Sequence, residues 1–118
     1  MSIRRQSRYF CPVDVTLSVI NGKWKPLILF HLKKNPQRFS KLQAALPHVS
    51  HKVLTQHLRE LEAADLICRA PSRDAAAVTY QLTDFGLTLR PSLTALAAWG
   101  QKYHRQIGVD LQWPGGRL

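Results

Sequence analysis

The sequence predicts a mainly α-helical domain with a small β-hairpin, and three observations support this fold class. The chain has 118 residues, of which 45% are hydrophobic and 20% charged, as expected for one globular domain. Apolar residues recur at the spacing of amphipathic helices along most of the chain. Only residues 66–70 and 78–82 resemble strands, and 78–82 alternates apolar with polar side chains.

The first two predicted helices precede residue 36. Residues 13–20 are a short apolar stretch of one or two helical turns, which an Asn-Gly pair at 21–22 ends. A longer helix begins near Lys23, because Pro26 is tolerated only in a first helical turn. An Asn-Pro pair at 35–36 closes this helix.

The next two helices form a helix-turn-helix pattern. Ser40 is the expected N-cap of a helix over 40–46, which Pro47 ends. After a short connection, Ser50 caps a second helix that runs to about residue 64. Two helices joined by a tight turn, the second with a polar outer face, predict this motif. The inward stripe of the second helix is Leu54, Leu58 and Leu61, and its outer face is Lys52, Thr55, Gln56 and Arg59.

The remaining elements add a wing and a long last helix. The two strand-like runs flank a polar loop over 71–77, as in a hairpin. Thr83 or Asp84 then caps the last helix, and Pro91 is expected to kink it or to split off its first turn. The element order predicts a winged helix-turn-helix with additional N- and C-terminal helices. The expected parts are a basic arm, the domain and a tail, over 1–10, 11–107 and 108–118.

The charge balance indicates a polyanionic partner. Seventeen Lys and Arg against seven Asp and Glu give a formal net charge of +10 and a pI near 10.3. The excess is greatest in residues 1–35, where Asp14 is the sole acidic residue. Nucleic acid and an anionic membrane surface both fit this balance.

Two further features indicate the cellular compartment. The longest apolar run, 95–99, is too short to cross a bilayer, and the first residues lack the apolar segment of a secretory signal. Two cysteines are too few for a disulfide scaffold. We therefore expect a cytoplasmic protein with reduced thiols and no membrane partner.

The outer face of the helix after Ser50 has two interpretations. Its polar and basic residues could form an ordinary solvated face, as on most amphipathic helices. Their position favours DNA instead, because a capped helix after a tight turn can enter the major groove. There Lys and Arg reach guanine, Gln reaches adenine and Thr contacts the thymine methyl group. We therefore expect this helix to recognise DNA sequence.

Further DNA contacts are expected on neighbouring segments. The first motif helix normally crosses the DNA backbone, a helix N-terminus attracts phosphate, and a wing follows phosphates or enters the minor groove. Solvation alone would also explain these polar residues. The candidates are Arg38, Ser40 and Lys41, then Ser50 and His51, then Arg69, Ser72 and Arg73. Three arginines of the arm, Arg4, Arg5 and Arg8, fit a disordered tail and a DNA-following arm equally well.

Cys11 has two interpretations that the residues leave open. It could be an inert, partly buried small residue, as many lone cysteines are. It could also be a thiolate in the electropositive surroundings of Arg8, able to form a sulfenic acid or a disulfide. Cys68, within a strand, is expected in the core.

No catalytic or metal-binding pattern is evident. The five histidines lack the Cys and carboxylate neighbours of a metal site, and His48 and His51 fall on different structural elements. There is no nucleophile with its base, no phosphate-binding glycine loop and no carboxylate pair. We therefore expect neither enzymatic activity nor a cofactor.

Six short motifs occur along the chain in a defined order. They are Cys11-Pro12-Val13, Gly22-Lys23-Trp24, RFSKL at 38–42, LTQHLRELE at 54–62, YQLTDFG at 80–86 and Trp99-Gly100. At this spacing they resemble the HxlR-type transcriptional regulators, relatives of the MarR-type winged-helix repressors. The resemblance covers about residues 11–100.

The resemblance implies a bacterial DNA-binding homodimer that pairs through its first and last helices. We accordingly expect a dimeric repressor of an inverted-repeat operator. Some members of the family sense oxidants or electrophiles through the cysteine at the place of Cys11, so a redox signal or a small effector is the expected input. The alternative is a winged-helix module that binds a protein or a membrane without recognising DNA. The apolar residues expected to pair the subunits are Val13, Leu17, Leu89, Leu93, Leu96, Trp99 and Tyr103.

Overall fold

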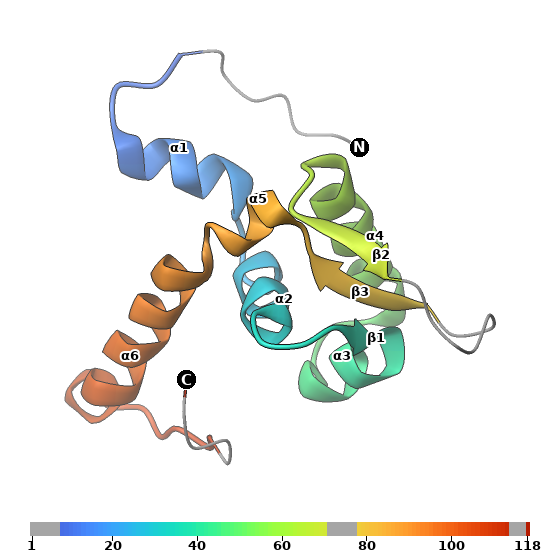
Figure 1. Cartoon of the computed structure of the whole chain (residues 1–118). Coiled ribbons are helices and arrows are strands. Elements are labelled where there is room, and N and C mark those ends of the chain that lie inside the picture. The colour runs from blue at the N-terminus through green and yellow to red at the C-terminus, as the bar shows by residue number, and fades with distance from the viewer. Residues whose placement is uncertain (1–7, 71–77, 114–117) are drawn as a thin grey trace.

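The structure, a computed structural model, describes residues 8–70, 78–113 and 118 (Figure 1). Its elements confirm a mainly helical chain with a small antiparallel sheet. In chain order they are α1 (Pro12–Val19), α2 (Trp24–Leu32), β1 (Gln37–Arg38), α3 (Phe39–Ala45), α4 (His51–Ala63), β2 (Ile67–Ala70), β3 (Thr79–Leu82), α5 (Asp84–Leu87) and α6 (Arg90–Ile107).

The sheet has three strands in the order β1-β3-β2, and both pairings are antiparallel. The wing hairpin pairs Ile67 with Leu82 and Ala70 with Thr79. Strand β1 was not expected from the sequence, since two residues are too few to show alternation. It exists because Gln37 and Arg38 pair with Tyr80 and Thr79 along the edge of β3 opposite β2. The following amide, of Phe39, still donates to the Val78 carbonyl at 3.4 Å.

The pairing of β1 corrects one expected helix boundary. Helix α3 begins at Phe39, and Arg38 holds the N-cap position with an extended backbone and no side-chain cap. Ser40 therefore lies within the first turn and is not the cap. The sheet keeps the backbone extended as far as Arg38, and the helix starts where that pairing stops.

The other expected caps are confirmed. The Ser50 hydroxyl accepts a hydrogen bond from the Val53 amide at 3.1 Å, and α4 starts directly after it. The Thr83 hydroxyl accepts from the Gly86 amide at 2.9 Å and starts α5. Pro91 lies in the first turn of α6, so the last helical region is split into α5 and α6. Each boundary follows from local chemistry that the sequence already contains.

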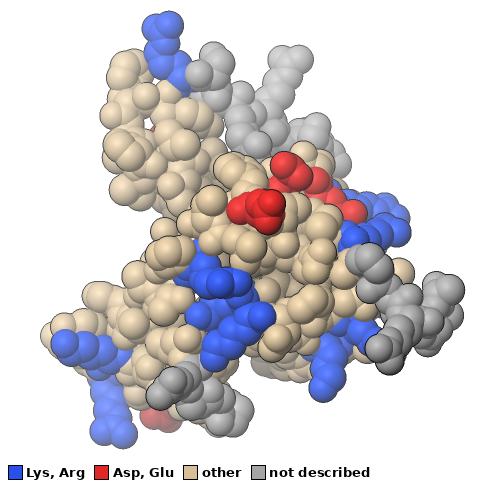
Figure 2. All heavy atoms as spheres, in the orientation of Figure 1, with Lys and Arg blue, Asp and Glu red and all other residues tan. Residues whose placement is uncertain are grey.

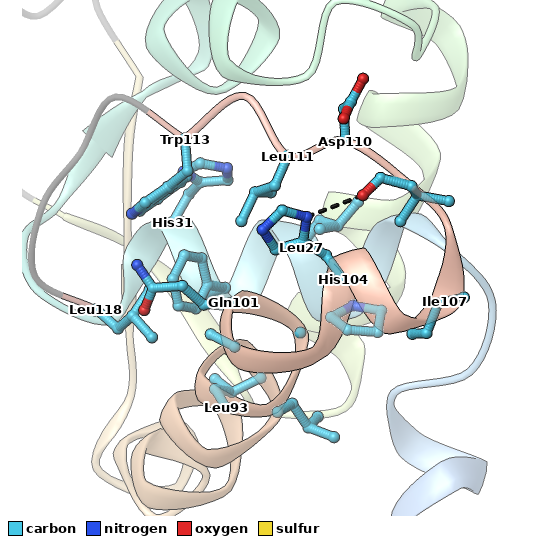
Figure 3. Close-up of a pocket in the computed structure, with 16 residues that line it drawn as sticks. Leu27, His31, Leu93, Gln101, His104, Ile107, Asp110, Leu111, Trp113 and Leu118 are labelled. Carbon is cyan, nitrogen blue, oxygen red and sulfur yellow. Dashed lines mark hydrogen bonds between the residues drawn. The ribbon is translucent and has the colours of Figure 1, made fainter.

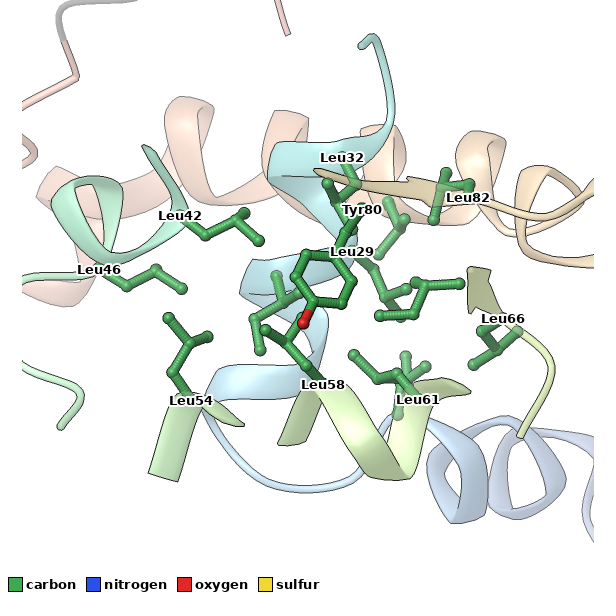
Figure 4. Close-up of a cluster of buried hydrophobic side chains, with 14 of the residues drawn as sticks. Leu29, Leu32, Leu42, Leu46, Leu54, Leu58, Leu61, Leu66, Tyr80 and Leu82 are labelled. Carbon is green, nitrogen blue, oxygen red and sulfur yellow. The ribbon is translucent and has the colours of Figure 1, made fainter. Parts of the chain in front are cut away.

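The core lies where α2, α3 and α4 meet the inner face of the sheet. Figure 4 shows leucines of α2 and α4 pointing toward Tyr80 and Leu82 of β3. The expected inward stripe of α4 is confirmed, since Leu54, Leu58 and Leu61 are buried. The fully buried side chains are Ile28, Leu29, Leu42, Leu54, Leu58, Leu61, Leu66 and Ile67.

Helices α1 and α6 extend away from this core (Figure 1). Helix α1 buries none of its residues, and α6 buries Leu93 alone among its eighteen. Helix α6 is held against α2 by Leu93, which packs in the core, and by the Lys33 ammonium at the end of α2, which donates to the Thr94 hydroxyl at 2.9 Å. Across the described ranges, none of the helices has the length and apolar character needed to cross a membrane.

Candidate nucleic-acid interface

The turn between α3 and α4 is held by side chains as well as by backbone. The Gln43 amide donates to the Val49 carbonyl at 2.6 Å, and the Val49 amide donates to the Leu46 carbonyl at 3.2 Å. Leu46 and Val49 are both buried in the core. With the Ser50 cap added, the start of α4 is fixed relative to α3.

The outer face of α4 is polar and accessible. Lys52, Gln56 and Arg59 are exposed on the side of the helix opposite the buried leucines. Thr55 is half-buried, and its hydroxyl donates to the His51 carbonyl at 2.8 Å. The face therefore presents two long cations and one amide, which are the groups that bind base edges and phosphates in a major groove.

An ion pair between a buried lysine and a half-buried glutamate supports this face from behind. The Lys25 ammonium of α2 lies 2.6 Å from a Glu60 carboxylate oxygen of α4, and Lys25 is only 6% exposed. The other Glu60 oxygen accepts from the Gln56 side-chain amide at 3.1 Å. Glu60 thus ties a residue of the outer face to the core helix α2.

The electrostatics of the pair follow from these contacts. The hydrogen bonds from Lys25 and then Gln56 hold the pKa of Glu60 below its ordinary value. His57, beside it, has its pKa lowered mainly by burial. Glu60 is therefore ionised and His57 largely uncharged at neutral pH.

Sequence reasoning missed the Lys25–Glu60 pair, although a signal was present. The buried residues of α2 are Lys25, Ile28, Leu29 and Leu32, at positions i, i+3, i+4 and i+7. A lysine in such a stripe requires an acidic partner, because an unpaired buried ammonium is costly.

The starts of α3 and α4 lie side by side. The Phe39 and His51 rings, from the first residues of these helices, have centroids 4.6 Å apart. The polar residues around this contact are therefore neighbours on one surface, beside the outer face of α4. Six of the expected DNA contacts are exposed here, namely Arg38, Ser40, Lys41, Ser50, His51 and Lys52.

The wing contributes one described candidate. Arg69 on β2 is exposed, and its Nε lies 3.6 Å from a Glu62 carboxylate oxygen of α4. Ser72 and Arg73 lie outside the described residues. Figure 2 shows the Lys and Arg side chains in several groups on the visible face, with carboxylates between them.

The expected pairing residues lie mostly at the surface. Val13 and Leu17 on α1 are exposed, as are Leu96 and Trp99 on α6, whereas Leu89 and Tyr103 are half-buried. Leu93 differs, because its side chain faces α2 and is only 3% exposed within the single chain. Leu93 therefore belongs to the domain core.

The thiols and candidate metal ligands are dispersed. Cys11 is exposed and directly precedes α1, while Cys68 on β2 is half-buried beside the Gln81 amide, 3.7 Å away. Cys68 is thus at the edge of the core. Across the part of the chain that the structure describes, no three His, Cys, Asp or Glu residues are grouped to hold a metal ion.

A helix-turn-helix with a capped, polar second helix, followed by an antiparallel hairpin, defines the class of winged-helix DNA-binding proteins. Comparison with known proteins gives the particular family. The chain belongs to the HxlR-like helix-turn-helix family, whose family model matches residues 19–107. The resemblance expected from the six motifs is confirmed.

Named relatives agree with this assignment. The chain is 40% identical over 98 residues to the uncharacterized HTH-type transcriptional regulator YdeP of Bacillus subtilis (strain 168), covering 82% of this chain and 77% of YdeP. It is 41% identical over 100 residues to an uncharacterized HTH-type regulator of Methanothermobacter thermautotrophicus, covering 80% and 73%. The family consists of transcriptional regulators, not enzymes.

Solved structures share the fold. The redox regulator HypR in its oxidized form superposes with a TM-score of 0.73 at 35% identity, covering 86% of this chain and all of HypR. The reduced form of the transcriptional regulator YodB from B. subtilis gives 0.65 at 28% identity, covering 80% and 95%. The chain is accordingly a DNA-binding transcriptional regulator with a MarR-like winged-helix fold.

Proposed function

We propose that this chain represses transcription as a two-fold symmetric dimer bound to an inverted-repeat DNA operator. The observation that carries this proposal is the outer face of α4, where Lys52, Gln56 and Arg59 project from a capped helix fixed to α3. Exposed Arg38, Ser40 and Lys41 at the start of α3 are suited to phosphate contacts that set the register. Arg69, Ser72 and Arg73 of the wing would add contacts beside the same groove.

The dimer is supported by apolar surface that the single chain leaves uncovered. Leu17 on α1 is 52% exposed and Trp99 on α6 is 57% exposed. A single recognition helix discriminates poorly between DNA sequences, whereas a dimer places two such helices about 34 Å apart on one face of the duplex. Pairing through α1 and α6 would bury this surface and supply the second helix.

The test is selection of bound duplexes from a random-sequence pool by the purified protein. The expected product is an inverted repeat whose half-sites are centred about 10 base pairs apart. Arg59→Ala and Gln56→Ala should each weaken binding to that sequence by about 1–3 kcal/mol and relax one position per half-site. Lys102→Ala, which removes an exposed cation of α6, is the matched control and should keep the preference.

Two results would contradict the proposal. One is the absence of an enriched inverted repeat. The other is binding to single-stranded RNA or anionic vesicles that equals binding to the selected duplex, which would favour the interaction module instead. Measuring the affinity at several salt concentrations separates phosphate contacts from base contacts. Each phosphate contact releases counterions and so makes the affinity fall more steeply with salt, whereas base contacts do not.

We further propose that Cys11 is a redox input to this regulator. Its thiol is exposed and lies at the start of α1, one of the two helices assigned to the dimer. The similar proteins HypR and YodB are described in oxidized, reduced and diamide-treated forms. Peroxide would convert the thiol to a sulfenic acid with release of water, and a polar group there would disturb the dimer.

The redox input is tested on the selected duplex. Peroxide should weaken binding by the wild type and leave Cys11→Ser unaffected, while Cys68→Ser should respond like the wild type. Peroxide-insensitive binding by the wild type would reject a sensing role for Cys11 and leave operator recognition untouched.

A further inference from the structure

The exposed side chain of Gln56 is held by a carboxylate whose two oxygens both have partners. One Glu60 oxygen lies 2.6 Å from the Lys25 ammonium, and the other accepts from Gln56 Nε2 at 3.1 Å. An ionised carboxylate accepts hydrogen bonds and donates none. Gln56 can therefore approach Glu60 only with its NH2 group, and its amide oxygen points away from Glu60.

Glu60 is itself fixed by the core helix α2. Lys25 is only 6% exposed, and its other printed partner, the Asn21 side-chain oxygen, is farther away at 3.5 Å. A buried ammonium is costly without its counter-charge, so the Glu60 carboxylate is held in place. An ordinary pair of residues one turn apart on an exposed helix is weak and lacks such support. The contact between Glu60 and Gln56 is therefore more rigid than its exposure suggests.

Helix α2 contacts α4 and α6 with different sides. Leu27 and His31 line a cavity of about 460 Å³ between α2, α6 and the segment after α6 (Figure 3). Leu96, one of the residues expected to pair the subunits, lines the same cavity, so this side of α2 adjoins the expected pairing surface. At 3.6 residues per turn, position 25 is rotated by roughly 160° from position 27. Lys25 thus serves α4, away from the pairing surface.

The held amide leaves one hydrogen-bonding edge free for DNA. Nε2 of Gln56 carries two hydrogens, of which Glu60 takes one. The remaining N–H and the amide oxygen offer one donor beside one acceptor. In the major groove adenine presents the acceptor N7 beside the donor N6, whereas guanine presents two acceptors, N7 and O6. The held amide therefore matches adenine and can satisfy only one of the two guanine acceptors.

We propose that Glu60 is a positioning residue that makes adenine the base recognised by Gln56. The inference rests on the proposed function, since it requires α4 to lie in the major groove. Glu60 acts through the orientation of the Gln56 amide and does not itself contact the DNA. The other long side chains of the outer face, Lys52 and Arg59, are donors only and suit guanine or phosphate. Adenine recognition by this face therefore depends on Gln56.

Glu60→Gln should reverse the hydrogen-bond polarity at this contact. The new side chain has a single oxygen, and the buried Lys25 ammonium requires it as an acceptor. Its NH2 group then faces Gln56, which must turn its own oxygen toward position 60. The group that Gln56 presents to DNA becomes a donor alone, which suits the guanine acceptors and leaves the adenine N6 amino group without an acceptor. The substitution should therefore change the preferred base and not only the affinity.

Competition binding on the selected inverted repeat tests this inference. The half-site position that Gln56 contacts is the one at which Gln56→Ala loses discrimination, and duplexes with adenine or guanine there are compared. The wild type should bind the adenine duplex about tenfold more tightly. Glu60→Gln should lower this ratio by about tenfold or more, so that guanine is bound at least as well. Glu62→Gln removes the same charge from the same helix and is the matched control, which should keep the wild-type ratio.

Two further variants separate positioning from stability. In the Gln56→Ala background, Glu60→Gln should no longer change the ratio, because the side chain that it orients is absent. Lys25→Met combined with Glu60→Leu removes both charges and leaves an apolar contact, which proteins often tolerate. This double variant frees Gln56, so the adenine preference should fall about threefold without passing to guanine. Thermal unfolding checks that each variant is folded, and the double variant decides the case if Glu60→Gln is unfolded.

Several results would overturn the inference and leave operator recognition intact. They are a wild type that prefers another base at the position of Gln56, a Glu60→Gln ratio equal to that of Glu62→Gln, and an effect of Glu60→Gln that persists without Gln56. A selected repeat in which no position depends on Gln56 would also overturn it. Failure of the proposed function is distinct, because it would appear earlier, as the absence of an enriched inverted repeat, and would overturn both.

Discussion

Glu60 links the core helix α2 to the outer face of α4 through its two carboxylate oxygens. One carboxylate oxygen contacts the buried Lys25 ammonium at 2.6 Å, and the other accepts from Gln56 at 3.1 Å. Such a carboxylate compensates a charge that could not otherwise remain in the core. It also limits the rotamers of Gln56, so part of the outer face of α4 is ordered in the free protein.

Replacing Glu60 should therefore destabilise the fold. We expect Glu60→Gln to lower the free energy of unfolding by about 1–3 kcal/mol, because Lys25 is left buried without a counter-charge. Glu62→Gln is the matched control: its pair with Arg69 is longer, at 3.6 Å, and more exposed, so the loss should stay below about 1 kcal/mol. Urea denaturation measures the free energy of unfolding of each variant. Equal decreases for Glu60→Gln and Glu62→Gln would contradict the assigned role of Lys25.

The same pair predicts how stability depends on pH. Lys25 and Gln56 lower the pKa of Glu60 from the ordinary value of 4.5, so the folded state binds fewer protons than the unfolded state in this range. The stabilisation is therefore complete above about pH 4.5 and is lost as the pH falls through the folded pKa. Denaturation midpoints between pH 6 and pH 3 should fall more steeply for the wild type than for Glu60→Gln. Parallel curves would contradict this prediction.

At the scale of elements, caps decide where the helices of the motif begin. Ser50→Ala should cost about 1 kcal/mol, because the Val53 amide loses its acceptor. Ser40→Ala is the matched control, since Ser40 is not a cap, and its effect should stay within about 0.5 kcal/mol. Thermal denaturation of the two variants compares them directly, and equal losses would place a cap at Ser40 after all.

The packing of α5 against the sheet depends on one close contact, between Gly86 and the Leu66 backbone. Gly86 packs against the Leu66 carbonyl, and a Cβ at Gly86 would overlap its oxygen. The same oxygen accepts from the Thr83 amide at 3.0 Å, so it cannot move away freely. Gly86→Ala should therefore lower stability by about 2 kcal/mol or more. Gly100→Ala, which has free space on a helix, should instead raise stability by up to about 1 kcal/mol.

At the scale of the whole molecule, the terminal helices lack partners within one chain. Trp99→Asp should give a folded monomer, because Trp99 is exposed and contributes little to the core. Sedimentation at micromolar concentration measures the mass, and thermal unfolding checks the fold. Ala98→Asp, on a different side of α6, should remain dimeric. A wild type that sediments as a monomer would contradict the proposed dimer.

The sequence by itself determined the features that depend on neighbouring residues. Ser50 and Thr83 cap helices because their hydroxyls reach amides three residues further on. Pro91 begins a helix because it needs no amide partner there. The periodic leucines of α4 and the alternation in β3 were enough to predict the helix-turn-helix, its buried side and the wing hairpin.

Only the tertiary structure decided the features that join distant segments. Strand β1 depends on β3, about forty residues later, and its pairing moved the start of α3 away from Ser40. The Lys25–Glu60 pair and the cavity behind α6 likewise join segments far apart in the chain. Local propensity cannot encode such contacts, because their free energy arises when separate elements exclude water from the same space.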